Sequence, residues 1–176
     1  MKIIRLTFLL SLISVTVCTQ VRTKKIENIS ISKDTSIVIE LNELAFKNRL
    51  KNPELTIAHA NKALKLAKSI NYINGIGEAY RILGVGNYYL NNIDASIKNY
   101  LSALTFFKQS QNLEGEAKVY NNIGNLYRDI DYNKSLENFY KSLRIAKKLQ
   151  IPDLIAGLYL NIGTVNQRQK KYEAAL

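Results

Sequence analysis

The apolar residues of this chain recur at helical spacing, and the same pattern returns every 39 or 40 residues. Three successive units each place an aromatic residue four positions before a glycine, in the pairs Tyr80–Gly84, Tyr120–Gly124 and Tyr159–Gly163. A second apolar run follows, and its positions repeat as Ala60, Tyr100, Phe139; Ala63, Ala103, Ser142; and Leu64, Leu104, Leu143. The spacing predicts antiparallel helix pairs that stack into an α-solenoid, because one pair cannot bury its apolar face alone.

The glycines of this pattern predict close crossings between the two helices of a unit. A glycine inside a helix costs about 1 kcal/mol relative to alanine, so close packing must compensate for it. We expect no room for a side chain at Gly84, Gly124 or Gly163. Pro53 and Pro152 are expected in first helical turns, where the amide proton that proline lacks is not needed.

The middle unit resembles the tetratricopeptide repeat, a helix pair with characteristic aromatic, glycine and small residues. The matching residues are Tyr120, Ile123, Gly124 and Tyr127 in the first helix, and Ser135, Phe139 and Ser142 in the second. The two serines replace the usual alanines, and Asn87 of the preceding unit stands where the family has tyrosine. The resemblance is to the exported bacterial type with long repeats of about 40 residues. It covers residues 36–176 and implies an all-α superhelix of stacked antiparallel helix pairs.

The pattern divides the repeat region into four units, at about 36–74, 75–114, 115–152 and 153–176. In the first unit, Leu44 occupies the glycine position. The last unit is expected to be incomplete, because residues 172–176 resemble the opening of a second helix. Its first helix should then expose the face that carries Tyr159 and Ile162. The chain is therefore interpreted as an N-terminal fragment of a longer protein.

Residues 1–19 have the layout of a secretory signal peptide, in which Lys2 and Arg5 precede an apolar run that ends at Cys18. This run is too short to span a bilayer comfortably. An uncleaved anchor helix is one alternative; another is lipidation of Cys18, although a valine precedes it where lipoprotein signals have a small residue. Residues 20–35 lack a helical period and predict a tether. We expect an exported protein, periplasmic or extracytoplasmic, with membrane attachment through a lipid anchor or a downstream segment as an open alternative.

The chain carries a formal net charge of +11 at pH 7. Its lysines look scattered along both helices of every unit, in no block longer than a pair, which favours a solvated surface. An acidic partner or an anionic membrane surface is the alternative interpretation. Nucleic acid is not expected as a partner, because an export signal removes the chain from it.

The residue pattern predicts a protein without enzymatic activity. His59 is the one histidine and lies between two alanines of a second helix, and Cys18 is the one cysteine, so no metal site is expected. The stretch Gly84-Val85-Gly86 lies within a helical pattern, without the strand that precedes a dinucleotide-binding loop. We therefore expect neither catalytic residues nor a cofactor.

The resemblance implies that the first helices line a concave groove that holds a partner. Residues flanking each glycine would point into it: Arg81, Val85, Tyr88, Tyr89, Asn121, Asn125, Arg128, Asp129, Thr164, Gln167 and Arg168. The residues that we expect to bind the partner are Arg81, Tyr88, Asn121, Asn125, Arg128, Gln167 and Arg168. Asparagine amides can hydrogen-bond to both the N–H and the C=O of a peptide backbone, and arginine can bind a carboxylate through two N–H groups at once. This lining suits a protein or peptide ligand of acidic character.

Two functions are consistent with the resemblance. The first is an exported protein–protein interaction scaffold that binds a peptide or partner protein in the groove of the array. The alternative is the extracytoplasmic sensory region of a larger signalling protein, a histidine kinase or DNA-binding regulator whose output domain follows residue 176. The downstream reading frame would distinguish the two.

Overall fold

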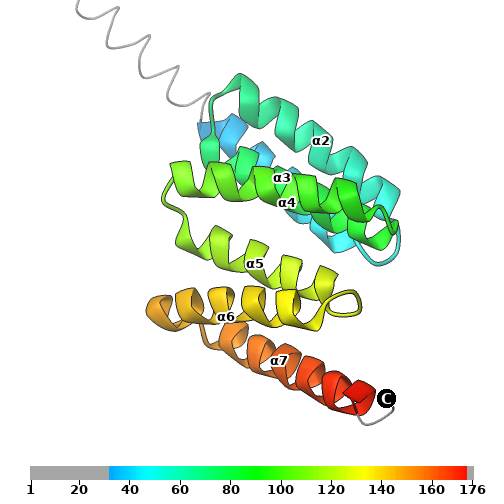
Figure 1. Cartoon of the computed structure of the whole chain (residues 1–176). Coiled ribbons are helices and arrows are strands. Elements are labelled where there is room, and N and C mark those ends of the chain that lie inside the picture. The colour runs from blue at the N-terminus through cyan, green and yellow to red at the C-terminus, as the bar shows by residue number, and fades with distance from the viewer. Residues whose placement is uncertain (1–31, 174–176) are drawn as a thin grey trace, which may run out of the picture.

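The computed structural model describes residues 32–173, and every regular element in this range is an α-helix (Figure 1). The helices are a first one over residues 32–48, α2 Pro53–Ser69, α3 Ile73–Tyr89, α4 Ile93–Gln109, α5 Leu113–Tyr127, α6 Tyr132–Leu149 and α7 Pro152–Glu173. Consecutive helices pack on one another, and the pairs stack in chain order. The predicted all-α solenoid is confirmed. The expected leader, most of the expected tether and the last three residues lie outside the described range.

The helix boundaries lie close to the predicted units. The first helices of the second, third and fourth units begin at residues 73, 113 and 152, within two residues of the expected positions. Pro53 and Pro152 each begin a helix, as predicted. Residues 32–35, assigned to the tether, are helical instead. Because α2, α3 and α4 each have 17 residues, the long repeat comes from long helices joined by short turns.

Four helices end in the same left-handed turn. Asn71, Asn91, Gln111 and Gln150 have φ values between 53° and 58°, which glycine usually adopts. At each site the next backbone N–H reaches five residues back, as from Tyr72 to the carbonyl oxygen of Ala67 at 2.8 Å. This bond satisfies a helix-terminal carbonyl and turns the chain into the next antiparallel helix.

The predicted glycine crossings hold in two units and fail in the last one. A Cβ on Gly84 would overlap the ring of Tyr100, and one on Gly124 would lie 2.5 Å from Cδ1 of Phe139. Around Gly163, however, no atom of the described residues lies within 4 Å of the Cβ position. The expectation of a crowded Gly163 is wrong, because no second helix covers α7 within the described residues.

A buried hydroxyl on each second helix bonds to the backbone of its partner helix at that same crossing. The bonds join Thr56 to Ala45 at 3.0 Å, Ser96 to Gly84 at 2.8 Å and Ser135 to Gly124 at 2.8 Å, in each case from the side-chain oxygen to the carbonyl oxygen. Ala45 is fully buried, whereas Leu44 is exposed. The small residue of the first unit is therefore Ala45, and the assignment of Leu44 to that position is wrong by one residue.

The ring of Phe107 packs between two neighbouring units. It is fully buried at the end of α4, and a Cβ on Gly77 of α3 or on Gly115 of α5 would lie 2.8 Å or 2.6 Å from it.

The last unit packs differently from the expectation. Ile162 is buried against α6, whereas Tyr159 is 52% exposed. The exposure of Tyr159 confirms the predicted exposed face, whereas the burial of Ile162 does not.

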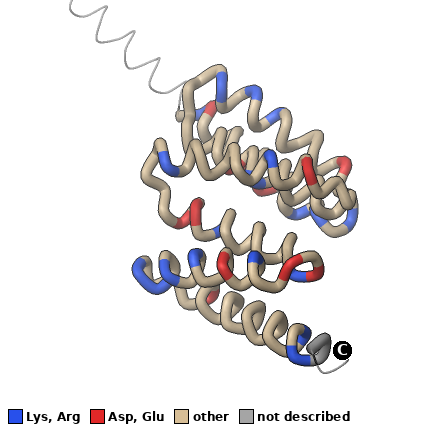
Figure 2. Tube along the Cα trace, viewed as in Figure 1, with Lys and Arg blue, Asp and Glu red and all other residues tan. Residues whose placement is uncertain are grey.

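Charge is divided between the two helices of each pair, contrary to the even scatter that we expected. The outer layer, defined as α2, α4 and α6, carries ten basic residues and three acidic ones. The basic residues are Lys62, Lys65, Lys68, Lys98, Lys108, Lys134, Lys141, Arg144, Lys147 and Lys148, and the acidic residues are Glu54, Asp94 and Glu137. The first helices, 32–48, α3, α5 and α7, together carry seven basic and eight acidic residues. Figure 2 shows this excess of basic residues along α2 and α6.

Candidate functional site: a polar groove between the first helices

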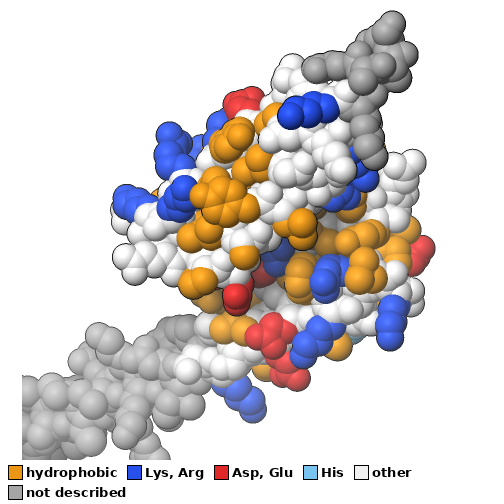
Figure 3. Space-filling view, turned by 90° about the horizontal axis from the view of Figure 1, so that it is seen from below, with side chains coloured by type: hydrophobic (Ala, Val, Ile, Leu, Met, Phe, Trp, Pro, Cys, Tyr) orange, Lys and Arg blue, Asp and Glu red, His pale blue; other side chains and the backbone are white. Residues whose placement is uncertain are grey.

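The first helices each have a small residue at the crossing position: Ala45, Gly84, Gly124 or Gly163. We call stripe the residues that stand six and three positions before it and one and four positions after it. This spacing keeps the four positions on one helix face. The stripe supplies half of the lining of a hollow of about 560 Å³: Ile39, Asn42, Glu43, Phe46, Tyr72, Asn74, Gly75, Glu78, Arg81, Phe107, Asn112, Lys118, Asn121 and Asn122. Figure 3 shows a hollowed face on which apolar side chains surround a few charged ones.

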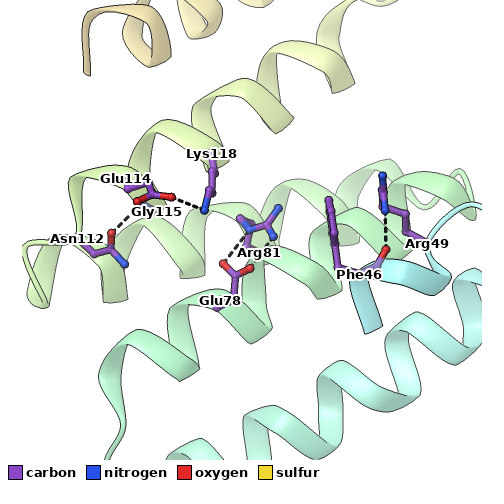
Figure 4. A network of polar contacts seen from close by, with 8 residues as sticks. All are labelled: Phe46, Arg49, Glu78, Arg81, Asn112, Glu114, Gly115 and Lys118. Atoms are coloured by element: carbon purple, nitrogen blue, oxygen red, sulfur yellow. Dashed lines mark hydrogen bonds and ion pairs between the residues drawn. The ribbon is translucent and has the colours of Figure 1, made fainter. Parts of the chain in front are cut away.

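An ion pair between a buried arginine and a half-buried glutamate lies in this larger hollow. Glu78 and Arg81 are one helical turn apart on α3, and Arg81 donates from Nε at 2.9 Å and from a terminal nitrogen at 2.6 Å to the two carboxylate oxygens (Figure 4). Burial alone would raise the pKa of Glu78, but the charge and hydrogen bonds of Arg81 outweigh it and hold that pKa below its usual value. Burial likewise opposes the charge of Arg81, and Glu78 raises its pKa. Both groups are therefore ionised at neutral pH.

Phe46 packs between two guanidinium groups from neighbouring units. Its ring centre lies 3.9 Å from the guanidinium carbon of Arg49 and 5.0 Å from that of Arg81. These distances are those of cation–π contacts. Arg49 also donates to the backbone oxygen of Phe46 at 2.8 Å (Figure 4). The contacts hold both arginines at the groove.

A smaller hollow of about 370 Å³ adjoins the larger one and shares Phe46, Asn121 and Asn122 with it. Its other lining residues are Arg49, Val85, Tyr88, Tyr89, Tyr100, Asn125 and Arg128. Two arginines and three asparagines therefore face a small volume with aromatic walls.

Asparagine amides connect the units across the groove. Asn112 donates to Asn74 at 3.2 Å, and Asn161 donates to Asn121 at 3.1 Å. Three other polar atoms buried at the groove have no hydrogen bond among the described residues, namely Oδ1 of Asn42, Nδ2 of Asn122 and Nε of Arg128. The Nε atom of Arg128 lies 3.9 Å from Asp129, too far for a hydrogen bond. A buried polar atom without a partner costs about 1–3 kcal/mol, so these three atoms favour a ligand that pairs with them.

Five of the seven candidate residues line the hollows, and two do not. Arg81, Tyr88, Asn121, Asn125 and Arg128 are lining residues. The remaining two, Gln167 and Arg168, lie on α7, outside both linings; Arg168 instead pairs with Asp129.

Arg81 lies in the groove but not in the role that we assigned to it. The fork expected to bind a ligand carboxylate is occupied by Glu78. The acidic partner at the preceding turn of the helix was the signal for this pairing.

The contribution of the first unit was missed. Asn42, Phe46 and Arg49 stand in the same stripe as Arg81, Val85 and Tyr88, counted from Ala45 instead of Leu44. The sequence interpretation named no groove residue in the first unit and so missed these three lining residues. A count of the stripe positions from the buried small residue would have found them.

Comparison with known proteins gives a narrow similarity. No protein-family model matches the chain. Response regulator aspartate phosphatase I of Bacillus subtilis (strain 168) is 42% identical over 52 residues. The match covers 30% of this chain and 13% of that protein. The chain is thus similar to a short segment of this phosphatase, and its repeated helix pairs are consistent with the tetratricopeptide resemblance.

Within residues 32–173, no three His, Cys, Asp or Glu side chains lie together as a metal site would require. No helix in the same range combines the length and the apolarity needed to cross a membrane.

Proposed function

We propose that this protein binds a peptide segment of another protein in the two hollows and that its role is binding rather than catalysis. The observation that carries the proposal is the set of three unpaired buried atoms on Asn42, Asn122 and Arg128. One is an acceptor and two are donors, and a peptide backbone offers both complementary groups. A helical repeat array is well suited to this task because its first helices form an extended inner surface.

The smaller hollow is the place for an acidic group of that peptide. Arg49 and Arg128 both line it, and neither has a bidentate carboxylate partner among the described residues. The arginine of the larger hollow, Arg81, is already neutralised by Glu78. The ligand should therefore place its carboxylate near Arg128 and its uncharged backbone near Asn122.

Binding of defined peptide pools to the full chain tests this proposal. Acidic, neutral and basic pools of random sequence are compared, and we expect the acidic pool to bind most tightly. Asn122→Ala should weaken all pools alike, because every peptide has the same backbone. Arg128→Gln should lower affinity for the acidic pool about tenfold, since hydrogen bonds to charged groups contribute about 1.5–3 kcal/mol.

Arg144→Gln is the matched control, because it removes the same charge from an exposed position of α6. It should leave the preference for the acidic pool unchanged. Equal binding of the three pools, or equal loss in the Arg128 and Arg144 variants, would contradict the proposed site.

A signalling context is the second candidate. The similarity to a segment of a protein named as a response regulator phosphatase supports it. In this alternative the peptide is a signal that the repeat array binds and transmits to an output domain.

We further propose that the chain is exported through the leader at residues 1–19. N-terminal sequencing of the protein purified from cells tests export, and a chain that begins at Met1 would contradict it.

A further inference from the structure

We propose that the outer layer of the solenoid, α2, α4 and α6, docks on an anionic lipid bilayer. This surface is on the side of the helix pairs opposite the groove, so it is a second interaction site, independent of the peptide site. Three properties of this surface indicate that a lipid bilayer binds it: its charge, the chemistry of its side chains and its position relative to the start of the described chain.

The charge of the outer layer is the first argument. The layer holds ten basic and three acidic residues, whereas the first helices are close to neutral. Several basic side chains are exposed and form no ion pair within residues 32–173, among them Lys65, Lys108, Arg144 and Lys148. A juxtaposed anionic membrane attracts such residues with about a fivefold gain in partition for each one.

The kind of side chain favours lipid over nucleic acid. Nine of the ten basic residues are lysines, which are compact, strongly hydrated charges without the planar fork that reads phosphates and bases. Exposed apolar residues lie among them: Leu101 is 55% exposed on α4, and Tyr140 is 53% exposed on α6. These two residues stand 39 positions apart and so occupy the same place in successive units. Lysines interspersed with aromatic and aliphatic side chains are typical of a surface that rests at the headgroup level.

The topology places the start of the described chain at the same edge. In an antiparallel pair, the first helix begins where the second helix ends. Residue 32 therefore lies at the edge that holds the C-terminal turns of the outer-layer helices. Those turns carry Lys68, Lys108 and Lys147, which repeat at 40 and 39 residues. If the leader, residues 1–19, is at a membrane, this edge is the part of the described chain nearest to the leader along the sequence and would meet the lipid surface first.

Vesicle co-sedimentation of the full chain tests the proposal. The probes are vesicles of phosphatidylcholine alone and vesicles in which a third of the lipid is phosphatidylglycerol. Any insertion of the apolar leader contributes to both, so the measured quantity is the ratio of the two partition coefficients. We expect binding to favour the anionic vesicles and to weaken at high salt, where the charges are screened.

Two matched quadruple variants locate the effect. The outer-layer variant carries glutamine at Lys65, Lys108, Arg144 and Lys148, and the control carries glutamine at Lys33, Lys47, Lys51 and Lys170, so both lose four charges from exposed positions. The outer-layer variant should lose about a hundredfold or more of the preference for anionic vesicles. The control variant should lose much less. An equal loss in both variants, or no loss in the first, would overturn the proposal.

Two further measurements keep the choice of partner testable. Leu101→Ser with Tyr140→Ser removes apolar groups that are exposed, so folding should be unaffected, and binding to anionic vesicles should fall at high salt in particular. A duplex oligonucleotide is the competing polyanion. If it bound the outer layer more tightly than the anionic vesicles at the same salt concentration, the lipid assignment would be wrong.

Discussion

Replacing Gly124 with alanine should destabilise the fold, whereas the same change at Gly163 should stabilise it. A Cβ at Gly124 would lie 2.5 Å from Cδ1 and 2.9 Å from Cγ of Phe139, whose side chain is fully buried. A Cβ at Gly163 would meet nothing within 4 Å. The two glycines occupy the same position of a first helix, so the substitutions differ mainly in the aromatic ring that covers the site.

The magnitude follows from two opposing terms. Overpacking a tight core costs about 1–3 kcal/mol, and a contact below 3 Å with a fully buried ring lies at the upper end. Alanine in place of glycine returns about 1 kcal/mol of helix propensity. We expect Gly124→Ala to lower the free energy of unfolding by about 2 kcal/mol, and Gly163→Ala to raise it by up to about 1 kcal/mol.

Urea unfolding of the full chain, followed by helical circular dichroism, measures both changes. A double-mutant cycle with Phe139→Leu is the control, because a smaller side chain relieves the clash and alanine at Gly124 should then cost less. If Gly124→Ala is as stable as the wild type, or if both alanines destabilise the chain alike, the covering ring is not what excludes a side chain.

Three further predictions concern other parts of the fold. Ser135→Ala should lower the free energy of unfolding by about 1 kcal/mol in urea, because the buried hydrogen bond to the Gly124 carbonyl is lost. Because pairing with Arg81 lowers the pKa of Glu78, this pair stabilises the fold above the usual carboxyl value of 4.5. That contribution should be lost as the pH falls below this value, as an unfolding titration with Glu78→Gln for comparison would show. Gln111→Gly should raise the thermal midpoint, because it relieves a left-handed conformation that costs about 1–2 kcal/mol.

The fold could be predicted from sequence because its signal is repeated. Gly84, Gly124 and the aromatic residues that cover them recur at a fixed period, and each recurrence reinforces the same interpretation. The first unit lacks glycine, so its register rested on counting from Leu44, and a repeat offset of 39 rather than 40 moved the small residue to Ala45. The role of the serines that replace alanines could not be predicted from sequence. Their hydrogen bonds to the facing helix depend on which backbone carbonyl lies opposite the hydroxyl.

The lining of the hollows was predictable where it follows helix geometry and not where it depends on contacts between units. Asn121, Asn125 and Arg128 face the groove because their spacing fixes their direction. Arg168 stands five positions after Gly163, one position beyond the stripe, and pairs with Asp129 of the neighbouring unit, which no single-helix pattern reveals. The unpaired atoms of the groove likewise became visible only once neighbouring helices were placed.

The ring of Phe107 sets a distance as well as filling a space. Since a Cβ on Gly77 or on Gly115 would overlap it, this ring limits how closely α3 and α5 can approach at this point. In a solenoid each unit is placed by its neighbour, so a change of tilt at this point carries every later helix with it. A thinner side chain there would alter the curvature of the whole array. The breadth of the opening that Asn121 and Arg81 face is thus controlled from α4, by a residue that belongs to the opposite layer of the molecule.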